Sequence, residues 1–84
     1  MEETLYLPTL SHWEYGNPWS GERGRAHFLI KPGEGVMNVE MWIGPMSREF
    51  AQVELTGQFP VSDEGIEQMR VWILDSAKQI NARG

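Results

Sequence analysis

The chain holds few residues whose types and spacing could do chemistry. His12 and Glu14 flank Trp13, so an extended backbone would place the imidazole and the carboxylate on one side. With His27 as a third group, they could bind a metal ion or act as an acid and a base. No metal-ligand spacing recurs, however, and the chain contains no cysteine. We therefore expect no metal site, no disulfide, no thiolate chemistry and no cofactor.

A glycine-rich stretch with two arginines is the second candidate site. Gly16, Gly21 and Gly24 lie around Arg23 and Arg25, but the stretch matches neither the P-loop pattern nor the dinucleotide-binding fingerprint. A strand is expected to follow it, so no helix N-terminus would point at a phosphate. The favoured interpretation is a turn-forming loop. The alternative is a small-ligand or catalytic site between this loop and the polar face of the sheet, formed by Arg23, Arg25, His27 and Glu40.

The remaining polar residues give no further indication of catalysis. No G-x-S-x-G elbow surrounds any of the serines. The carboxylates are dispersed along the chain and do not indicate a catalytic pair. An enzyme is therefore unsupported, and no catalytic residue is assigned.

Aromatic residues are the third group with a chemical use. Four tryptophans in 84 residues is a high number, and large aromatic side chains serve both small cores and interfaces. Trp13, Tyr15 and Trp19 gather among prolines and glycines, and form either a small core that caps the sheet or an exposed anchor patch. Trp42 is buried if the N-terminal segment folds across its face of the sheet, and otherwise marks a binding surface. The candidate protein-binding residues are therefore Trp13, Tyr15, Trp19 and Trp42.

Alternating apolar and polar residues predict the strands that would position these side chains. Residues 25–31 and 36–43 alternate in this way, and the glycine-containing turn between them predicts a hairpin. Residues 49–56 alternate again and predict a third strand, which residues 57–60 close.

The first 24 residues are expected to form a loop-rich aromatic head. Their prolines and glycines argue against a helix. Short extended pieces are expected at residues 5–7 and 12–15, followed by a turn or ordered loop at residues 16–21.

The clearest prediction is a helix over residues 62–81. Ser62 is a good N-cap, and the acidic residues that follow it suit the positive end of the helix dipole. Residues 81–84 are expected to fray. Apolar side chains recur at helical spacing: Ile66, Met69, Ile73, Ala77 and Ile80.

These elements predict one α+β domain over residues 1–84, with the head in 1–24, the strands in 25–60 and the helix in 62–81. We expect a three- or four-stranded antiparallel meander covered on one face by the single C-terminal helix. The expected core is Phe28, Ile30, Val39, Met41, Ile43, Val53, Leu55, Ile66, Met69, Ile73 and Ala77. The opposite, mostly polar face is expected to carry His27, Asn38, Glu40, Trp42, Gln52 and Glu54.

Composition and charge narrow the classes of partner. Seven basic residues against twelve acidic ones give a net charge of −5, which repels phosphate backbones, so we expect no direct nucleic-acid binding. No apolar run approaches the roughly 18 residues that span a membrane. The lack of cysteine and of a basic leader sequence favours a cytoplasmic protein.

Residues 15–21 (YGNPWSG), followed by Arg23-Gly24 and Phe28-Leu29-Ile30, resemble the start of a group of short bacterial proteins of unknown function. In that group a stretch like residues 59–66 and a helix that bears a tryptophan like Trp72 close the domain. The resemblance covers residues 13–74. It implies a small cytoplasmic bacterial protein of phage or other mobile-element origin. It carries no known active site, so it transfers no functional residue.

Two functions from different classes follow as expectations. The first is a small acidic interaction protein that binds another protein, or itself as a homo-oligomer, through an aromatic surface. One form of it would be an inhibitor of a host or phage-defence protein, steered to a basic site by its charge. The second is the small-ligand or catalytic domain described above.

Overall fold

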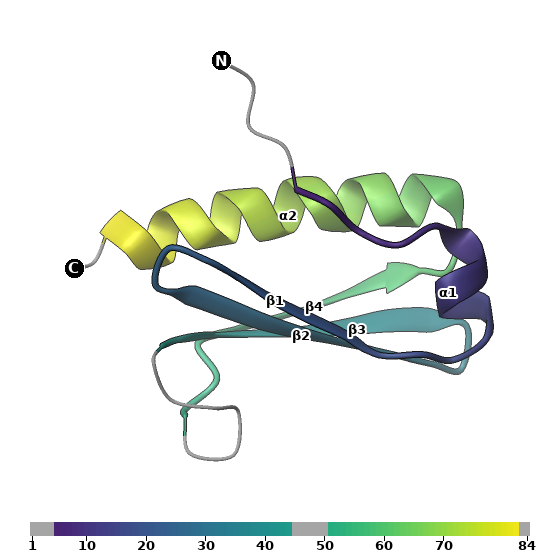
Figure 1. Ribbon diagram of the computed structural model, residues 1–84, viewed down its shortest axis with the longest axis horizontal. Coiled ribbons are helices and arrows are strands. Elements are labelled where there is room, and N and C mark those ends of the chain that lie inside the picture. The colour runs from purple at the N-terminus through teal and green to yellow at the C-terminus, as the bar shows by residue number, and fades with distance from the viewer. Residues whose placement is uncertain (1–4, 45–50, 83–84) are drawn as a thin grey trace.

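The fold consists of a four-stranded antiparallel sheet with one long helix packed across it. The computed structural model describes residues 5–44 and 51–82. The strands follow one another in the sheet in chain order, β1-β2-β3-β4, and α2 lies along one face (Figure 1). This confirms the predicted α+β meander, with four strands. The elements are α1 (Leu10–Glu14), β1 (Trp19–Arg23), β2 (Ala26–Gly33), β3 (Val36–Ile43), β4 (Leu55–Pro60) and α2 (Asp63–Ala82).

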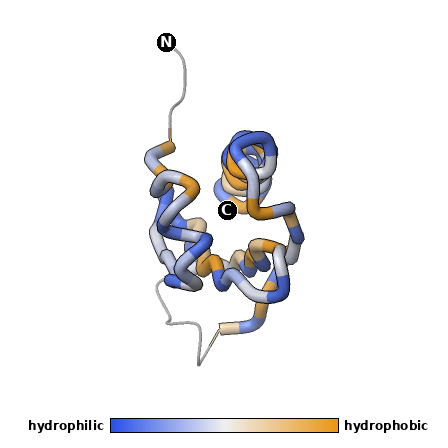
Figure 2. The backbone as a smooth tube through the Cα atoms, turned by 90° about the vertical axis from the view of Figure 1, so that its right-hand side faces the viewer, coloured by the Kyte–Doolittle hydropathy of each residue, from blue (hydrophilic) through white to orange (hydrophobic). Residues whose placement is uncertain are grey.

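The N-terminal segment, residues 5–9, lies beside α2, on the same side of the sheet (Figures 1 and 2). Leu7 is buried in the core there, and Arg70 of α2 donates its Nε–H to the carbonyl oxygen of Leu5 at 2.9 Å. The N-terminal segment therefore does not cross the polar face that carries Trp42. Neither of the helices in the described ranges 5–44 and 51–82 is long and apolar enough to span a membrane.

The core fills the space between the sheet, α2 and the N-terminal segment. Strand register places Phe28 opposite Met41 and Ile30 opposite Val39, so neighbouring strands present their apolar side chains to the same face. The expected core is largely correct, but Val53 lies outside the sheet and is only partly buried. Core residues that the expected set lacked are Leu7, Trp13, Ala26, Met37 and Ile80.

The first turn of α2 follows the sequence prediction. The Gly65 amide donates to Ser62 Oγ at 2.9 Å, which makes Ser62 the N-cap. A Cβ on residue 65 would overlap the carbonyl oxygen of Pro60, so glycine allows this turn to lie directly on the end of β4.

The last turn of α2 is tied to the sheet through Asn81, which corrects the expected fraying at this residue. Its side-chain oxygen accepts the Arg25 amide at 2.7 Å. Its side-chain nitrogen donates to the carbonyl oxygens of Arg23 at 3.1 Å and Ala77 at 2.8 Å. These bonds join α2 to the tight turn between β1 and β2, where Gly24 has a φ of +64°. Residues 83 and 84 lie outside the described residues.

The predictions for the head were wrong in three places. Residues 5–7 form no strand, the extended piece expected at 12–15 is largely the helix α1, and β1 lies partly in the expected loop 16–21. Burial of the Trp13 side chain in the core holds α1 in place despite the nearby helix breakers. Gly21 suits β1 because a Cβ there would lie 2.7 Å from Phe28 Cζ, so the ring covers the glycine.

The last strand is displaced along the chain from its expected position. Residues 51–54 are not in a strand, and residues 49 and 50 lie outside the described residues. β4 instead spans Leu55–Pro60, the last two residues of the expected strand and the four expected to close it, with Met41 opposite Leu55 and Val36 opposite Pro60. Gly57 faces the helix within β4, and the ring of Trp72 lies over it. The packing of the Trp72 ring on the bare backbone of Gly57 favours a strand at residues 55–60 over the expected strand at 49–56.

Candidate functional site

The four aromatic candidates separate into buried and exposed residues. Trp13 is 2% exposed and donates its Nε1–H to the carbonyl oxygen of Pro8 at 3.2 Å, so it belongs to the core. Trp42 is 5% exposed, although it lies on the face of the sheet opposite α2. Trp19 is half-buried, and Tyr15 is 83% exposed. Only Tyr15 and Trp19 are therefore open to a partner.

An exposed group of aromatic rings gathers beside β1. Tyr6 packs edge-on against Trp19, with ring centroids 5.7 Å apart, and His12 also packs edge-on against Trp19, at 5.8 Å. Tyr6 is 73% exposed. We call Tyr6, His12 and Trp19 the aromatic cluster. Three rings held in contact at a surface form the kind of rigid, amphipathic patch that protein interfaces use.

The aromatic cluster is fixed by the fold around it. β1 places Trp19 opposite Ile30 of β2, and α1 carries His12 next to the buried Trp13. The His12 Nε2 atom lies 3.1 Å from the carbonyl oxygen of Pro18, which bonds the ring to the segment that enters β1. The rings are therefore positioned before any partner arrives.

Tyr6 was absent from the predicted candidates. Its signal in the sequence is its position between Leu5 and Leu7. In an extended segment the two leucines share one side, and the tyrosine takes the other. The core takes Leu7 and contacts Leu5, so the tyrosine ring turns outward.

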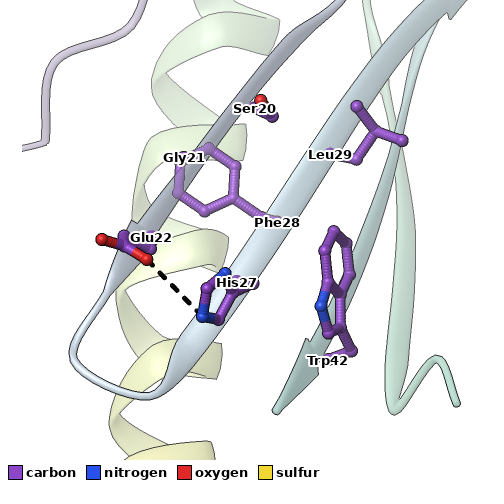
Figure 3. Close-up of a pocket in the computed structure, with 7 residues that line it drawn as sticks. All are labelled: Ser20, Gly21, Glu22, His27, Phe28, Leu29 and Trp42. Carbon is purple, nitrogen blue, oxygen red and sulfur yellow. Dashed lines mark ion pairs between the residues drawn. The ribbon is translucent and has the colours of Figure 1, made fainter. Parts of the chain in front are cut away.

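A second feature is a pocket of about 400 Å³ on the face of the sheet opposite α2 (Figure 3). The His27 ring stacks on Trp42, with centroids 6.0 Å apart, and His27 Nε2 lies 3.5 Å from a carboxylate oxygen of Glu22. A Cβ on Gly44 would overlap the His27 ring, which therefore lies against bare backbone. The pocket is lined by Ser20, Gly21, Glu22, His27, Phe28, Leu29 and Trp42.

The structure does not bring the alternative ligand-site residues together. The backbones of Arg23 and Arg25 bond to Asn81, and Arg25 also donates from Nη2 to the Asn81 carbonyl oxygen at 3.4 Å. His27 and Glu40 instead lie on the face opposite α2, paired with Trp42 and Leu29 respectively. The four residues of the expected site are therefore separated. Arg23 and Arg25 lie at the end of α2, and His27 and Glu40 lie on the face of the sheet opposite α2.

The metal-site hypothesis also lacks its geometry. His12 lies on α1 and His27 on β2, and Glu14 follows His12 on a helix, where an extended piece was needed. Among residues 5–44 and 51–82, no three histidine, aspartate or glutamate side chains group closely enough to hold a metal ion.

Comparison with known proteins gives no indication of function, so a proposal of function depends on the geometry described above. No protein-family model matches the chain, no curated protein matches it, and no solved structure matches it. The resemblance to short bacterial and phage proteins stays a prediction.

Proposed function

We propose that this protein is a small binding domain that engages a protein partner through the aromatic cluster and the adjoining strand β1. The observation that carries the proposal is the exposed Tyr6 ring, packed on Trp19 at the edge of the sheet. Tyrosine and tryptophan supply large contact areas with few rotatable bonds, so they lose little conformational entropy when a partner covers them.

The edge position supports the same function. Among the strands of residues 5–44 and 51–82, β1 lies at the edge of the sheet and pairs with β2 alone. Edge strands pair readily with another chain. A partner that contacted the aromatic cluster would reach this edge as well, so the two features form one surface.

Truncation of Tyr6 tests the proposal with little risk to the fold. Tagged wild-type protein and Tyr6→Ala are used to capture proteins from a lysate of the source cells, and the captured proteins are quantified by mass spectrometry. A binding-surface tyrosine at the centre of an interface contributes about 2 kcal/mol, so recovery of the partner should fall roughly thirtyfold.

Val71→Ala is the matched control, because Val71 is 58% exposed on α2 and is not a member of the aromatic cluster. Its recovery of the partner should equal that of the wild type. Equal recovery with Tyr6→Ala would remove the aromatic cluster from the interface and overturn the proposal.

Binding of a small ligand in the pocket opposite α2 is the second candidate function. The volume of this pocket, about 400 Å³, falls in the range of small-molecule sites, and the Glu22–His27 pair places polar groups at its wall. Thermal-shift screening against nucleotides, sugars and metal ions tests it, since a ligand that binds the folded protein raises its melting temperature. A genuine hit should lose its shift in His27→Ala, and no shift with any compound would count against a ligand site.

A further inference from the structure

We propose that β1 pairs antiparallel with β1 of a second copy of this chain, about a two-fold axis at Gly21, so that two four-stranded sheets join. This inference rests on the proposed function and names the partner class of the same surface. It follows from three features of β1: the direction of its backbone groups, the order of its charges and the position of the aromatic cluster.

Hydrogen bonding across the sheet determines which residues of β1 point outward. The Gly44 amide donates to the Arg25 carbonyl oxygen at 2.7 Å, so Arg25 directs its backbone groups toward β3. Backbone direction alternates along a strand, so Ala26 and Phe28 direct theirs toward β1. Their partners Arg23 and Gly21 face β2 in return. The backbone groups of Ser20 and Glu22 therefore point away from β2, toward the outer edge.

Only a few registers let two copies of β1 pair through these outward groups. A two-fold axis at Glu22 would place two like charges opposite each other, which is unfavourable. An axis at Ser20 would place Pro18 opposite Glu22, and proline has no amide hydrogen to donate. An axis at Gly21 pairs all five residues of β1 and avoids both problems.

The register about Gly21 also makes the side chains complementary. The Ser20 hydroxyl of each copy lies opposite the Glu22 carboxylate of the other and can donate to it. Trp19 lies opposite Arg23, and a guanidinium group over an indole ring is a favourable cation–π pair. Each contact occurs twice in the dimer, and the arrangement is closed, so it does not extend into a filament.

This pairing accounts for the exposure of the aromatic cluster. Trp19 and Arg23 share the face of α2, because they pair with Ile30 and Ala26 of the core. The second copy would therefore bring its Arg23 to the same face of the joined sheets as Trp19, on which Tyr6 packs. Ser20 and Glu22 lie on the other face, at the wall of the pocket (Figure 3).

The first test measures the mass of the untagged protein by sedimentation equilibrium. The protein concentration is raised to about 1 mM, at which even a dimer with a millimolar Kd is detected. The mass should rise with concentration from 9.6 kDa toward twice that value. Ser20→Pro removes one outward amide and leaves the bonds between β1 and β2 intact, so it should remain monomeric. Ser20→Ala keeps that amide and should still dimerise.

The second test uses charge at the same position. Ser20→Lys places an ammonium group opposite Glu22 of the other copy and should strengthen dimerisation, whereas Ser20→Glu should weaken it. Two such pairs per dimer predict a change in Kd of roughly three- to tenfold in each direction. Far-ultraviolet circular dichroism confirms that each variant is folded.

The outcomes separate this inference from the proposed function. A wild-type protein that stays monomeric at every concentration overturns the inference. A dimer that persists unchanged in Ser20→Pro and Ser20→Glu also overturns it. If the monomer still captures a different protein, and Tyr6→Ala abolishes that capture, the aromatic cluster keeps its role and only the second copy is excluded.

Discussion

Gly65 shows how one residue decides whether two elements can meet. In an exposed helix, alanine is about 1 kcal/mol more favourable than glycine. Here a Cβ would overlap the Pro60 carbonyl oxygen, which is backbone and cannot move without shifting β4. Packing therefore outweighs helix propensity at this position.

Gly65→Ala should accordingly destabilise the protein, by about 1–3 kcal/mol, because overpacking forces the backbone to shift. Urea denaturation followed by circular dichroism measures the change. Gln68→Ala, on the exposed side of the same helix, is the control and should be neutral or slightly stabilising. A rise in the urea midpoint for Gly65→Ala would contradict the overlap with Pro60.

At the scale of elements, the clearest link between distant parts of the chain is Asn81. Two hydrogen bonds of its side chain connect the last turn of α2 to the hairpin turn between β1 and β2, and a third holds the side chain to the Ala77 carbonyl oxygen within α2. Asn81→Ala leaves the Arg25 amide and the Arg23 carbonyl oxygen without this partner. The expected cost is about 1–3 kcal/mol of stability.

Hydrogen exchange at the Arg25 amide distinguishes the individual bonds. Asn81→Ala should speed exchange there, whereas Asn81→Asp keeps an oxygen acceptor for the Arg25 amide and should preserve most of the protection. Unchanged exchange in both variants would show that the hydrogen bonds of Asn81 do not hold the turn.

The elements differ in how far their sequence determined them. α2 and the hairpin of β2 and β3 were predicted, because their apolar residues follow the helical and strand periods over many positions. α1 and β1 were missed because tertiary contacts decide them: burial of Trp13 holds α1, and Phe28 covers Gly21 in β1. β4 was displaced because the ring of Trp72 packs on Gly57, a contact that no local pattern reveals.

The candidate site was predictable to a similar extent. The sequence drew attention to the aromatic residues of the head, and Tyr15 and Trp19 are indeed exposed or half-exposed. It could not separate them from Trp13 and Trp42, because a tryptophan has the same periodic signal in a core and at an interface. The cluster of Tyr6 with Trp19 depends on the N-terminal segment lying beside α2, which only the tertiary structure shows.

The whole molecule depends on a small core that includes the head. Trp13 is the largest of its fully buried side chains, and a chain of this size has modest total stability. Removal of a buried tryptophan side chain costs about 3–5 kcal/mol. Trp13→Ala should therefore unfold much of the population at 25 °C.

Thermal unfolding followed by circular dichroism measures this effect. Trp13→Phe loses the hydrogen bond to Pro8 but keeps most of the apolar volume, so its melting temperature should fall less. Tyr15→Ala, at an exposed position, should leave the melting temperature within error of the wild type. A stable, cooperative Trp13→Ala variant would mean that the head is not part of the folding unit.

The place of α2 at the end of the domain has a consequence for the nascent chain. The ribosome delivers the whole meander before the helix that covers its apolar face. At about 5–20 residues per second, the 20 residues of α2 take roughly one to four seconds to synthesise. Throughout that interval the sheet lacks the helix that covers Phe28, Val39 and Met41, so these side chains are open to any chaperone that binds apolar segments.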